Sequence, residues 1–438
     1  MDISDKKYDP ETVGERLYDL IEKLFPLCRS ITGSGVRKTL EILQDDIPLK
    51  THEVPSGTKV FDWVVPREWN IRDAYIKNSH GKRVVDFQKS NLHVLNYSIP
   101  VHTTLPLGRL RSHLHTLPEH PEWIPYRTTY YKETWGFCLP HRDLVKLEDD
   151  EYEVLIDSTL EDGSLTYGEL FVEGESEDEV LITTHVCHPS LCNDNLSGIA
   201  VSTILAQWIS DAGTRYSYRF LFLPGTIGAI TWLALNEEKT RGIRHGLVLA
   251  GLGDAGPVTY KKSRRGDAEI DRAMGQVLKD SGDDHRILDF TPYGYDERQF
   301  CSPGFNLPVG RLSRSVYGQY PEYHTSADDL HFVVRASLAD SFQKILSLVS
   351  VLENNGRYLN LQPRCEPQLG RRGLYRTPGA DEMALLWVLN LSDGQHSLLD
   401  ICALSGMDFA AVNAAKDTLF KHDLLASAVE KQVDGSSE

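Results

Sequence analysis

The sequence of 438 residues predicts an α/β fold, with a mostly parallel central sheet that helices cover on both faces. The first observation is a set of apolar runs with few polar interruptions, which is typical of strands buried on both faces; the runs cover residues 179–184, 219–223 and 246–250. The second is that patterns of helical periodicity alternate with these runs; they cover residues 199–209, 228–238, 270–279 and 336–354. Such alternation indicates strands joined by helical crossovers.

The length of the chain allows roughly three domains. After two N-terminal helical patterns, short β-prone runs alternate with turn residues over more than a hundred positions. We therefore expect an α/β domain of residues 1–50 and 171–358, interrupted by an inserted, mostly β domain at 51–170. A loop rich in Pro, Arg and Gly then leads to three short helical patterns, which predict a winged-helix-like domain at 365–438.

The amino-acid composition of the chain argues against several classes of function. A formal charge of −17 argues against nucleic acid or an anionic membrane as the main partner, and no apolar run reaches the roughly 20 residues of a membrane-spanning helix. The first residues, Met1 to Asp5, lack the basic and apolar regions of a signal peptide. The seven cysteines are scattered and odd in number, which favours reduced thiols and a cytoplasmic location. The C-terminal segment has more acidic than basic residues, so we expect it to pack or to bind protein rather than DNA.

The most informative segment is THVCHPSLCNDNLSG, which lies between a predicted strand and a predicted helix and carries His185, His188 and Asp194. Further along the chain, YHTSADD supplies His324 just before another predicted helix. Ligands and metals bind where strands give way to helices in open α/β sheets, and a metal hydrolase draws its ligands from several segments. Alone, Asp194 would more often cap the helix that follows. Together with His185 and His324, it is expected to bind metal.

In combination, His185, the DNLSG run with Asp194, and YHTSADD with His324 resemble the zinc aminopeptidases with the phosphorylase/hydrolase-like fold. With the predicted insertion and tail, the whole chain is similar to a bacterial group of aminopeptidase-like proteins of poorly defined function, often associated with polysaccharide or secondary-metabolite biosynthesis. The resemblance implies one or two zinc ions, with His185 binding one, His324 binding the other and Asp194 bridging them. It also implies a further ligand, placed best on Asp254, although Asp254-Ala-Gly-Pro257 equally fits a tight turn.

The sequence departs from that family where a Glu-Glu pair, a general base followed by a zinc ligand, is expected. Here the chain reads Gly225-Thr226, and these residues can do neither job. The ion at His324 would keep three ligands, whereas the ion at His185 would keep only two unless His188 or Cys187 replaces the missing one. We therefore expect a mononuclear site, or a site rebuilt around His188.

The segment PYGYDERQF, residues 292–300, lies where related enzymes line the substrate pocket. Glu297 could act as the general base or bind a substrate amine, and Arg298 could bind a carboxylate through two parallel hydrogen bonds. Asp296 and Glu322 are further candidates for substrate binding. The alternative for the charged run is a set of surface salt bridges. The basic cluster KKSRR, which begins at Lys261, is either a solvated loop or an anion site.

These features predict a zinc-dependent hydrolase that cleaves an amide bond of a small peptide or peptide-like metabolite. The alternative is a metal-binding scaffold that recognises such a molecule without turning it over, because Gly225 and Thr226 replace the Glu-Glu pair. In both cases the expected partner is a small molecule, not nucleic acid or a membrane, and a second copy of the chain is a further candidate.

Overall fold

The computed structural model describes residues 8–375 and 381–428, and their contacts divide the chain into two compact units. The first unit comprises Met1–Gly266 and His285–Gln343, and the second comprises Asp267–Asp284 and Lys344–Glu438. The segment Met1 to Asp5 and parts of the predicted domain 365–438 lie outside the described residues. Within the described ranges, no helix combines the length and the apolar character that crossing a membrane requires.

The first unit is built around an eight-stranded sheet in the order β1-β10-β12-β11-β13-β16-β14-β15. Its middle strands β12, β11, β13 and β16 run parallel to one another, and β10 and β14 on either side of them run antiparallel. The strands are β1 Lys50–Pro55, β10 Ser164–Val172, β11 Glu179–His185, β12 Ser217–Leu223, β13 Ile243–Leu249, β14 Val258–Lys261, β15 His285–Leu288 and β16 Val309–Ser313. The predicted mostly parallel α/β sheet is thus confirmed.

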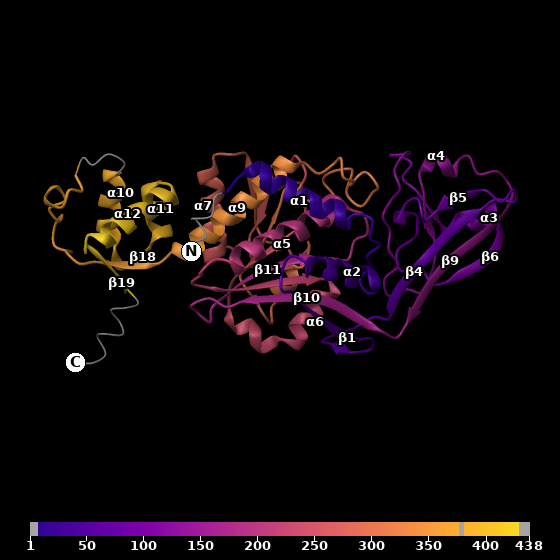
Figure 1. Ribbon diagram of the computed structural model, residues 1–438, viewed down its shortest axis with the longest axis horizontal. Helices are drawn as coiled ribbons and strands as arrows, with labels where there is room; N and C mark the ends of the chain where they lie inside the picture. The colour runs from indigo at the N-terminus through magenta and orange to yellow at the C-terminus, as the bar shows by residue number, and fades with distance from the viewer. Residues whose placement is uncertain (1–7, 376–380, 429–438) are drawn as a thin grey trace. The chain divides into compact units, whose positions relative to one another are not determined.

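Helices cover both faces of this sheet (Figure 1). Helices α1 (Pro10–Leu24), α2 (Ser34–Leu43) and α5 (Ser197–Ser210) lie on one face, and α6 (Ile227–Leu235) lies on the other. Asp9 caps α1 by accepting a hydrogen bond from the Thr12 N–H, and the helix buries one apolar stripe. By contrast, α5 is buried almost all round, because it packs between α1 and the sheet. The long helix α9 (Arg335–Asn354) follows strand β16 in the chain.

Between β1 and β10 the chain forms a separate antiparallel sheet in the order β5-β4-β9-β6. Its strands are β4 Glu68–Lys77, β5 Arg83–Asp86, β6 Val101–Pro106 and β9 Glu151–Glu161. The shorter elements of the first unit are β2 Lys59–Val60, β3 Trp63–Val64, α3 Leu107–Leu110, β7 Leu114–His115, β8 Phe137–Cys138, α4 His141–Leu144 and α8 Glu297–Phe300. Trp69 anchors the core of this region: it is 2% exposed and its indole N–H donates to the Ser98 carbonyl at 2.8 Å. Because β1 pairs with β10, the segment predicted as an insertion begins and ends in strands of the large sheet.

The second unit contains a compact group of three helices and three antiparallel strands, the arrangement of a winged helix. The helices are α10 Glu382–Leu391, α11 Leu398–Ser405 and α12 Phe409–Lys421, and the strands are β17 Arg357–Asn360, β18 Asp393–Ser397 and β19 Leu425–Ser427. Ser397 and Asp400 form a capping box that starts α11. Helix α7 (Glu269–Ser281) also belongs to this unit, and Arg272 on α7 pairs with Asp400 at 2.6 Å.

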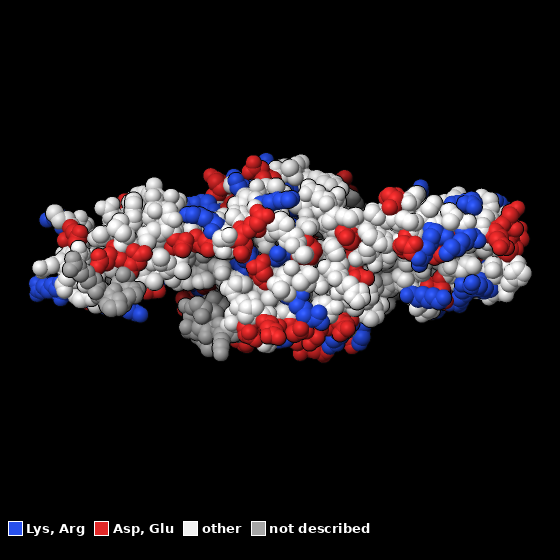
Figure 2. Space-filling model, turned by 90° about the horizontal axis from the view of Figure 1, so that it is seen from above, with Lys and Arg blue, Asp and Glu red and all other residues white. Residues whose placement is uncertain are grey.

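Acidic and basic side chains are interspersed over the face drawn in Figure 2. In the four-stranded sheet, several of the basic side chains pair with a carboxylate on a neighbouring strand: Arg72 with Asp157 at 2.6 Å, and Lys77 with Glu153 at 2.7 Å. These basic groups are therefore already partly neutralised within the sheet.

Candidate metal centre

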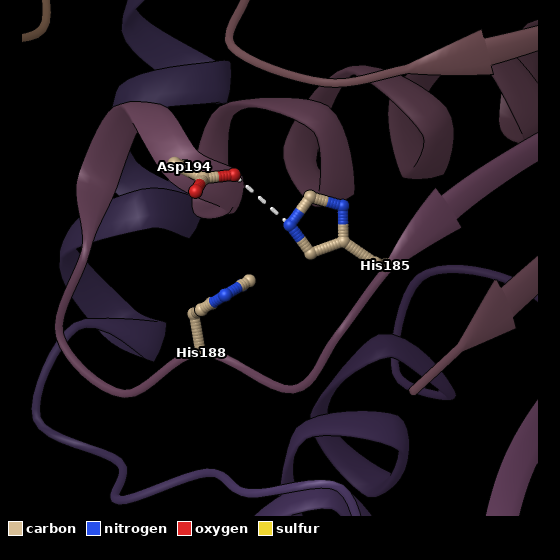
Figure 3. Close-up of side chains that lie close together, drawn as sticks. All are labelled: His185, His188 and Asp194. Atoms are coloured by element: carbon tan, nitrogen blue, oxygen red, sulfur yellow. Dashed lines mark hydrogen bonds and ion pairs between the residues drawn. The ribbon is translucent and has the colours of Figure 1, made fainter. Parts of the chain in front are cut away.

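Three potential metal ligands point toward one another where β11 gives way to α5 (Figure 3). His185 is the last residue of β11, a strand in which every residue is buried, and Asp194 lies in the irregular turn Cys192–Leu196 that leads into α5. The His185 Nε2 atom is 3.0 Å from Oδ1 of Asp194. With His188, these residues form a group whose ligand atoms all lie within 4.8 Å of one another. Among the described residues, no other group of three or more His, Cys, Asp or Glu side chains meets that condition.

His324 approaches the same carboxylate from the opposite side. Its Nε2 atom lies 3.0 Å from Oδ2 of Asp194, so the two oxygens of Asp194 face two different imidazoles. The ring of His188 lies between them, with its centroid 4.8 Å from that of His185 and 5.1 Å from that of His324. The structure therefore brings together four of the five predicted metal ligands.

The protonation states of this group suit metal binding. Burial by itself would raise the pKa of Asp194, but the neighbouring imidazoles, His188 foremost, and the hydrogen bonds from His185 and His324 hold it well below its usual range. Burial is also the main reason that the pKa of His188 lies well below its usual value. An ionised carboxylate and a neutral imidazole are the forms in which these side chains bind metal, so little deprotonation is needed.

Residues that the sequence did not single out hold the ligands in place. The buried carboxylate of Asp328 accepts hydrogen bonds from the Asn193 and Asp194 N–H groups at 2.6 and 2.9 Å. The guanidinium of Arg29, which is fully buried, donates from Nε to the His188 carbonyl at 2.8 Å. The sequence gives one sign of the first contact, because Asp328 lies in the same YHTSADD motif as His324. It gives none of the second, because 159 positions separate Arg29 from His188.

Tyrosine rings frame the imidazoles. Tyr295 stacks on His185 with 5.0 Å between ring centroids, and Tyr323 stacks on His324 at 3.9 Å. Tyr126, from the segment between strands β1 and β10, packs its ring against His324 at 5.1 Å. The Tyr126 N–H also donates to the His324 carbonyl at 2.7 Å, so this segment is part of the site.

Asp254, the fifth predicted metal ligand, does not join the group within the described residues. Its carboxylate accepts from the Ser315 hydroxyl at 2.6 Å, from the Gly256 N–H at 2.7 Å and from the Asn193 amide at 2.9 Å. These hydrogen bonds use the side chain to close its own turn and to brace the loop before Asp194. The alternative of a tight turn describes Asp254 correctly, and the expected set of Asp194, Asp254 and His324 does not assemble.

Glu297, predicted as the general base, is turned away from the metal ligands into a buried ion pair. Its Oε1 atom accepts from Lys261 Nζ at 2.9 Å and lies 3.6 Å from Nη1 of Arg311, and the three side chains are 0 to 3% exposed. Glu297 begins helix α8, and its side chain points in a different direction from that of Asp296. The carboxylate of Glu297 is therefore engaged in this ion pair and does not lie among the metal ligands.

Asp296 faces the metal group instead. Its side chain is 3% exposed, and its Oδ1 and Oδ2 atoms lie 3.5 and 3.6 Å from the position that a Cβ atom on Gly225 would take. That same position is 3.1 Å from Cβ of His185. Gly225 therefore leaves space beside His185, and the carboxylate of Asp296 borders that space. Burial, and secondarily Glu297, raises the pKa of Asp296 to about 7.

The remaining predicted residues lie around the site or away from it. Arg298 is half-buried, and its guanidinium lies 5.8 Å from the centroid of the Tyr293 ring. Glu322 is also half-buried, and only its backbone carbonyl is bonded, to Thr325, among the contacts of the described residues. The basic cluster does not converge on one point: Lys262 pairs with Asp289, and the guanidinium groups of Arg264 and Arg265 both reach Asn306.

Comparison with known proteins agrees with this geometry. Residues 18–355 match a family described as a domain of unknown function, DUF4910, and residues 356–427 match a winged helix-turn-helix family. A protein of Clostridium acetobutylicum named "Putative polysaccharide biosynthesis protein with aminopeptidase-like domain" is 56% identical over 421 residues, which cover 95% of this chain and 96% of that protein.

Solved structures extend the likeness. The crystal structure of a "putative peptidase" from the same organism has a TM-score of 0.93 at 55% identity and covers 95% of this chain and 97% of that one. A zinc aminopeptidase from Bacillus subtilis has a TM-score of 0.57 at 14% identity, covering 77% of this chain and 94% of that one, so it shares the fold. The chain therefore belongs to the DUF4910 family, and in it a domain with the fold of zinc aminopeptidases precedes a winged helix.

Proposed function

We propose that this protein is a zinc-dependent hydrolase of the aminopeptidase type, which cleaves an amide bond of a small peptide or peptide-like metabolite. One observation carries the proposal: the buried carboxylate of Asp194 faces His185 on one oxygen and His324 on the other, with His188 beside them. This is a set of nitrogen and oxygen donors of the kind that zinc prefers. The aminopeptidase-like fold supports the same class of reaction.

His185, His188 and Asp194 are the residues that would hold the ion, because they offer two imidazole nitrogens and a carboxylate oxygen from one preformed group. Zinc bound there would supply a polarised substrate carbonyl and a water of lowered pKa. His324, at the second oxygen of Asp194, would fix the orientation of this carboxylate. We propose one ion for each chain, since Gly225 and Thr226 offer no carboxylate for a second.

The surroundings of the ligands support a small substrate. Tyr295 and Tyr323 cover the faces of two imidazoles and provide apolar surface next to the reacting centre. Asp328 and Arg29 fix the two loops that carry Asp194 and His188, so the ligands need little rearrangement when an ion binds.

The test is the zinc content of the purified protein together with its hydrolysis of aminoacyl para-nitroanilides and dipeptides. We expect about one zinc for each chain, hydrolysis of at least one class of substrate, loss of that activity on chelation and its return when zinc is added. A protein that binds no zinc would contradict the proposal. A fully loaded protein that leaves every substrate intact would favour the metal-binding scaffold instead.

A further inference from the structure

Gly225 has no side chain, and the carboxylate that lies next to its Cβ position belongs to Asp296, from a different part of the chain. Gly225 follows β12, next to β11 and His185 in the sheet. Asp296 belongs to the loop that joins β15 to α8, and its two oxygens lie 3.5 and 3.6 Å from the point where a Cβ atom of residue 225 would lie. Any longer side chain at position 225 would therefore compete with Asp296 for the same space.

Asp296 is both buried and unpaired. It is 3% exposed, yet its carboxylate makes no hydrogen bond or ion pair with any other residue that the structure describes. A buried carboxyl without a partner is costly, so folded proteins seldom keep one that has only a structural role. Its neighbour Glu297 differs, because Oε1 of that carboxylate pairs with Lys261 and lies near Arg311, and only its Oε2 atom is without a hydrogen bond among the described residues.

Hydrogen bonds from Lys261 hold the loop that carries Asp296 in place. Lys261 Nζ donates to the carbonyl oxygens of Thr291 and Tyr293 at 2.7 and 2.8 Å, and to Glu297 at 2.9 Å. These three hydrogen bonds hold the loop on both sides of Asp296. The ring of Tyr295, one residue before it, is stacked on His185. Both contacts fix where the carboxylate lies relative to the metal group.

We propose that Asp296 is the catalytic carboxylate of this site, the group that takes the proton of the attacking water and delivers it to the leaving amine. This inference rests on the proposed hydrolase function. As the water oxygen forms its bond to the substrate carbonyl carbon, one proton moves to a carboxylate oxygen of Asp296. When the carbon–nitrogen bond breaks, its electron pair stays on nitrogen, and the same proton moves from Asp296 to that nitrogen. Atoms and charge balance without a further reactant.

The ionisation of Asp296 agrees with such a role. Burial raises its pKa to about 7, near the pH at which a proton carrier works best. Lys261 and Glu297 are then positioning residues, because they act through the loop and do not reach the reacting atoms.

The experiment compares Asp296→Asn with the wild-type protein and with Asp289→Asn, which removes a carboxylate on an exposed side chain of the same loop. Zinc content and the hydrolysis of aminoacyl para-nitroanilides are measured for each protein. For Asp296→Asn we expect unchanged zinc content, KM within a few-fold of wild type, and kcat lower by about 10²- to 10⁴-fold. The Asp289→Asn protein should match the wild type.

A second measurement does not depend on turnover. Leucine hydroxamate loses a proton when it binds a metal site, and calorimetry in buffers of different ionisation enthalpy counts the protons released. At pH 8 the carboxyl of Asp296 is mostly ionised and can take up part of this proton, so the wild type should release fewer protons to the buffer than Asp296→Asn. Equal release would overturn the proposal, as would unchanged kcat. Loss of zinc would mean that Asp296 is a ligand, and raised KM with unchanged kcat would mean that it binds the substrate amine. Failure of the proposed function itself would show in the wild-type protein, as absent zinc or absent turnover.

Discussion

His324 and Asp194 are 130 positions apart in the chain, yet Nε2 of one lies 3.0 Å from Oδ2 of the other. Asp194 is fully buried and has its other oxygen on His185. The contact therefore ties the loop before α9 to the turn before α5, across the C-terminal edge of the parallel strands. Through His324, a part of the chain that is remote in sequence contacts Asp194 in the metal group.

Replacing His324 with alanine should weaken zinc binding by at least about 10-fold, because Asp194 loses the group that orients its second oxygen. Competition with a chromogenic chelator measures this affinity. The control is His331→Ala, which removes an exposed histidine from the same loop. Equal affinity in the two variants would show that His324 contributes nothing to the site.

Replacing Glu297 with glutamine should destabilise the first unit by about 3–5 kcal/mol, since it leaves Lys261 and Arg311 buried without their counter-charge. Urea denaturation measures the free energy of unfolding. As the control, Lys262→Met breaks a pair with the exposed Asp289 and should cost at most about 1 kcal/mol. A Glu297→Gln protein as stable as the wild type, but without activity, would restore Glu297 as the general base.

Replacing Gly225 with glutamate should lower activity rather than raise it, although it adds a carboxylate beside the metal group. The new Cβ atom would lie 3.1 Å from Cβ of His185, and the rest of the side chain would run into Asp296. We expect kcat to fall at least about 10-fold through displacement of these groups. Gly213→Glu is the control, because a side chain there meets nothing within 4 Å. Higher activity in Gly225→Glu would indicate a site that has lost its base.

His93 should make the stability of the first unit depend on pH. Its ring is bonded through Nδ1 to the Cys138 carbonyl at 2.8 Å, and burial lowers its pKa below the usual value. Between the folded and the unfolded pKa the unfolded chain binds more protons, so stability is complete above about pH 6.5 and declines as the pH falls through the folded value. Thermal unfolding from pH 7.5 to 5 should show this decline, and His93→Gln should reduce it. An equal slope in both proteins would assign the pH dependence to other groups.

The fold followed from the sequence because burial on both faces leaves a strong pattern. The run that forms β11 has an apolar centre and is buried from end to end, and the helix after it is apolar on nearly every side. Ligands at the end of such a strand could be predicted, since the ends of parallel strands meet at one edge. His185, His188 and Asp194 come from one such strand and the connection that follows it.

The roles within residues 296–298 could not be predicted in the same way. Three charged residues in succession must point in different directions, and the direction of each depends on where α8 begins. Helix α8 starts at Glu297, which sends this side chain to Lys261 and leaves Asp296 at the metal group. Asp254 shows a different limit, because a carboxylate that closes its own turn and one that binds metal have the same local sequence.

The contact of Tyr126 with His324 has a consequence for how the protein matures. Tyr126 and His324 belong to segments that meet only after the region between β1 and β10 has docked on the large sheet. The surroundings of His324 are therefore complete only in a chain whose two sheets have both formed and come together. An ion held by Asp194, the carboxylate that His324 contacts, would stabilise this docked form, and its binding energy would be shared by both sheets of the first unit.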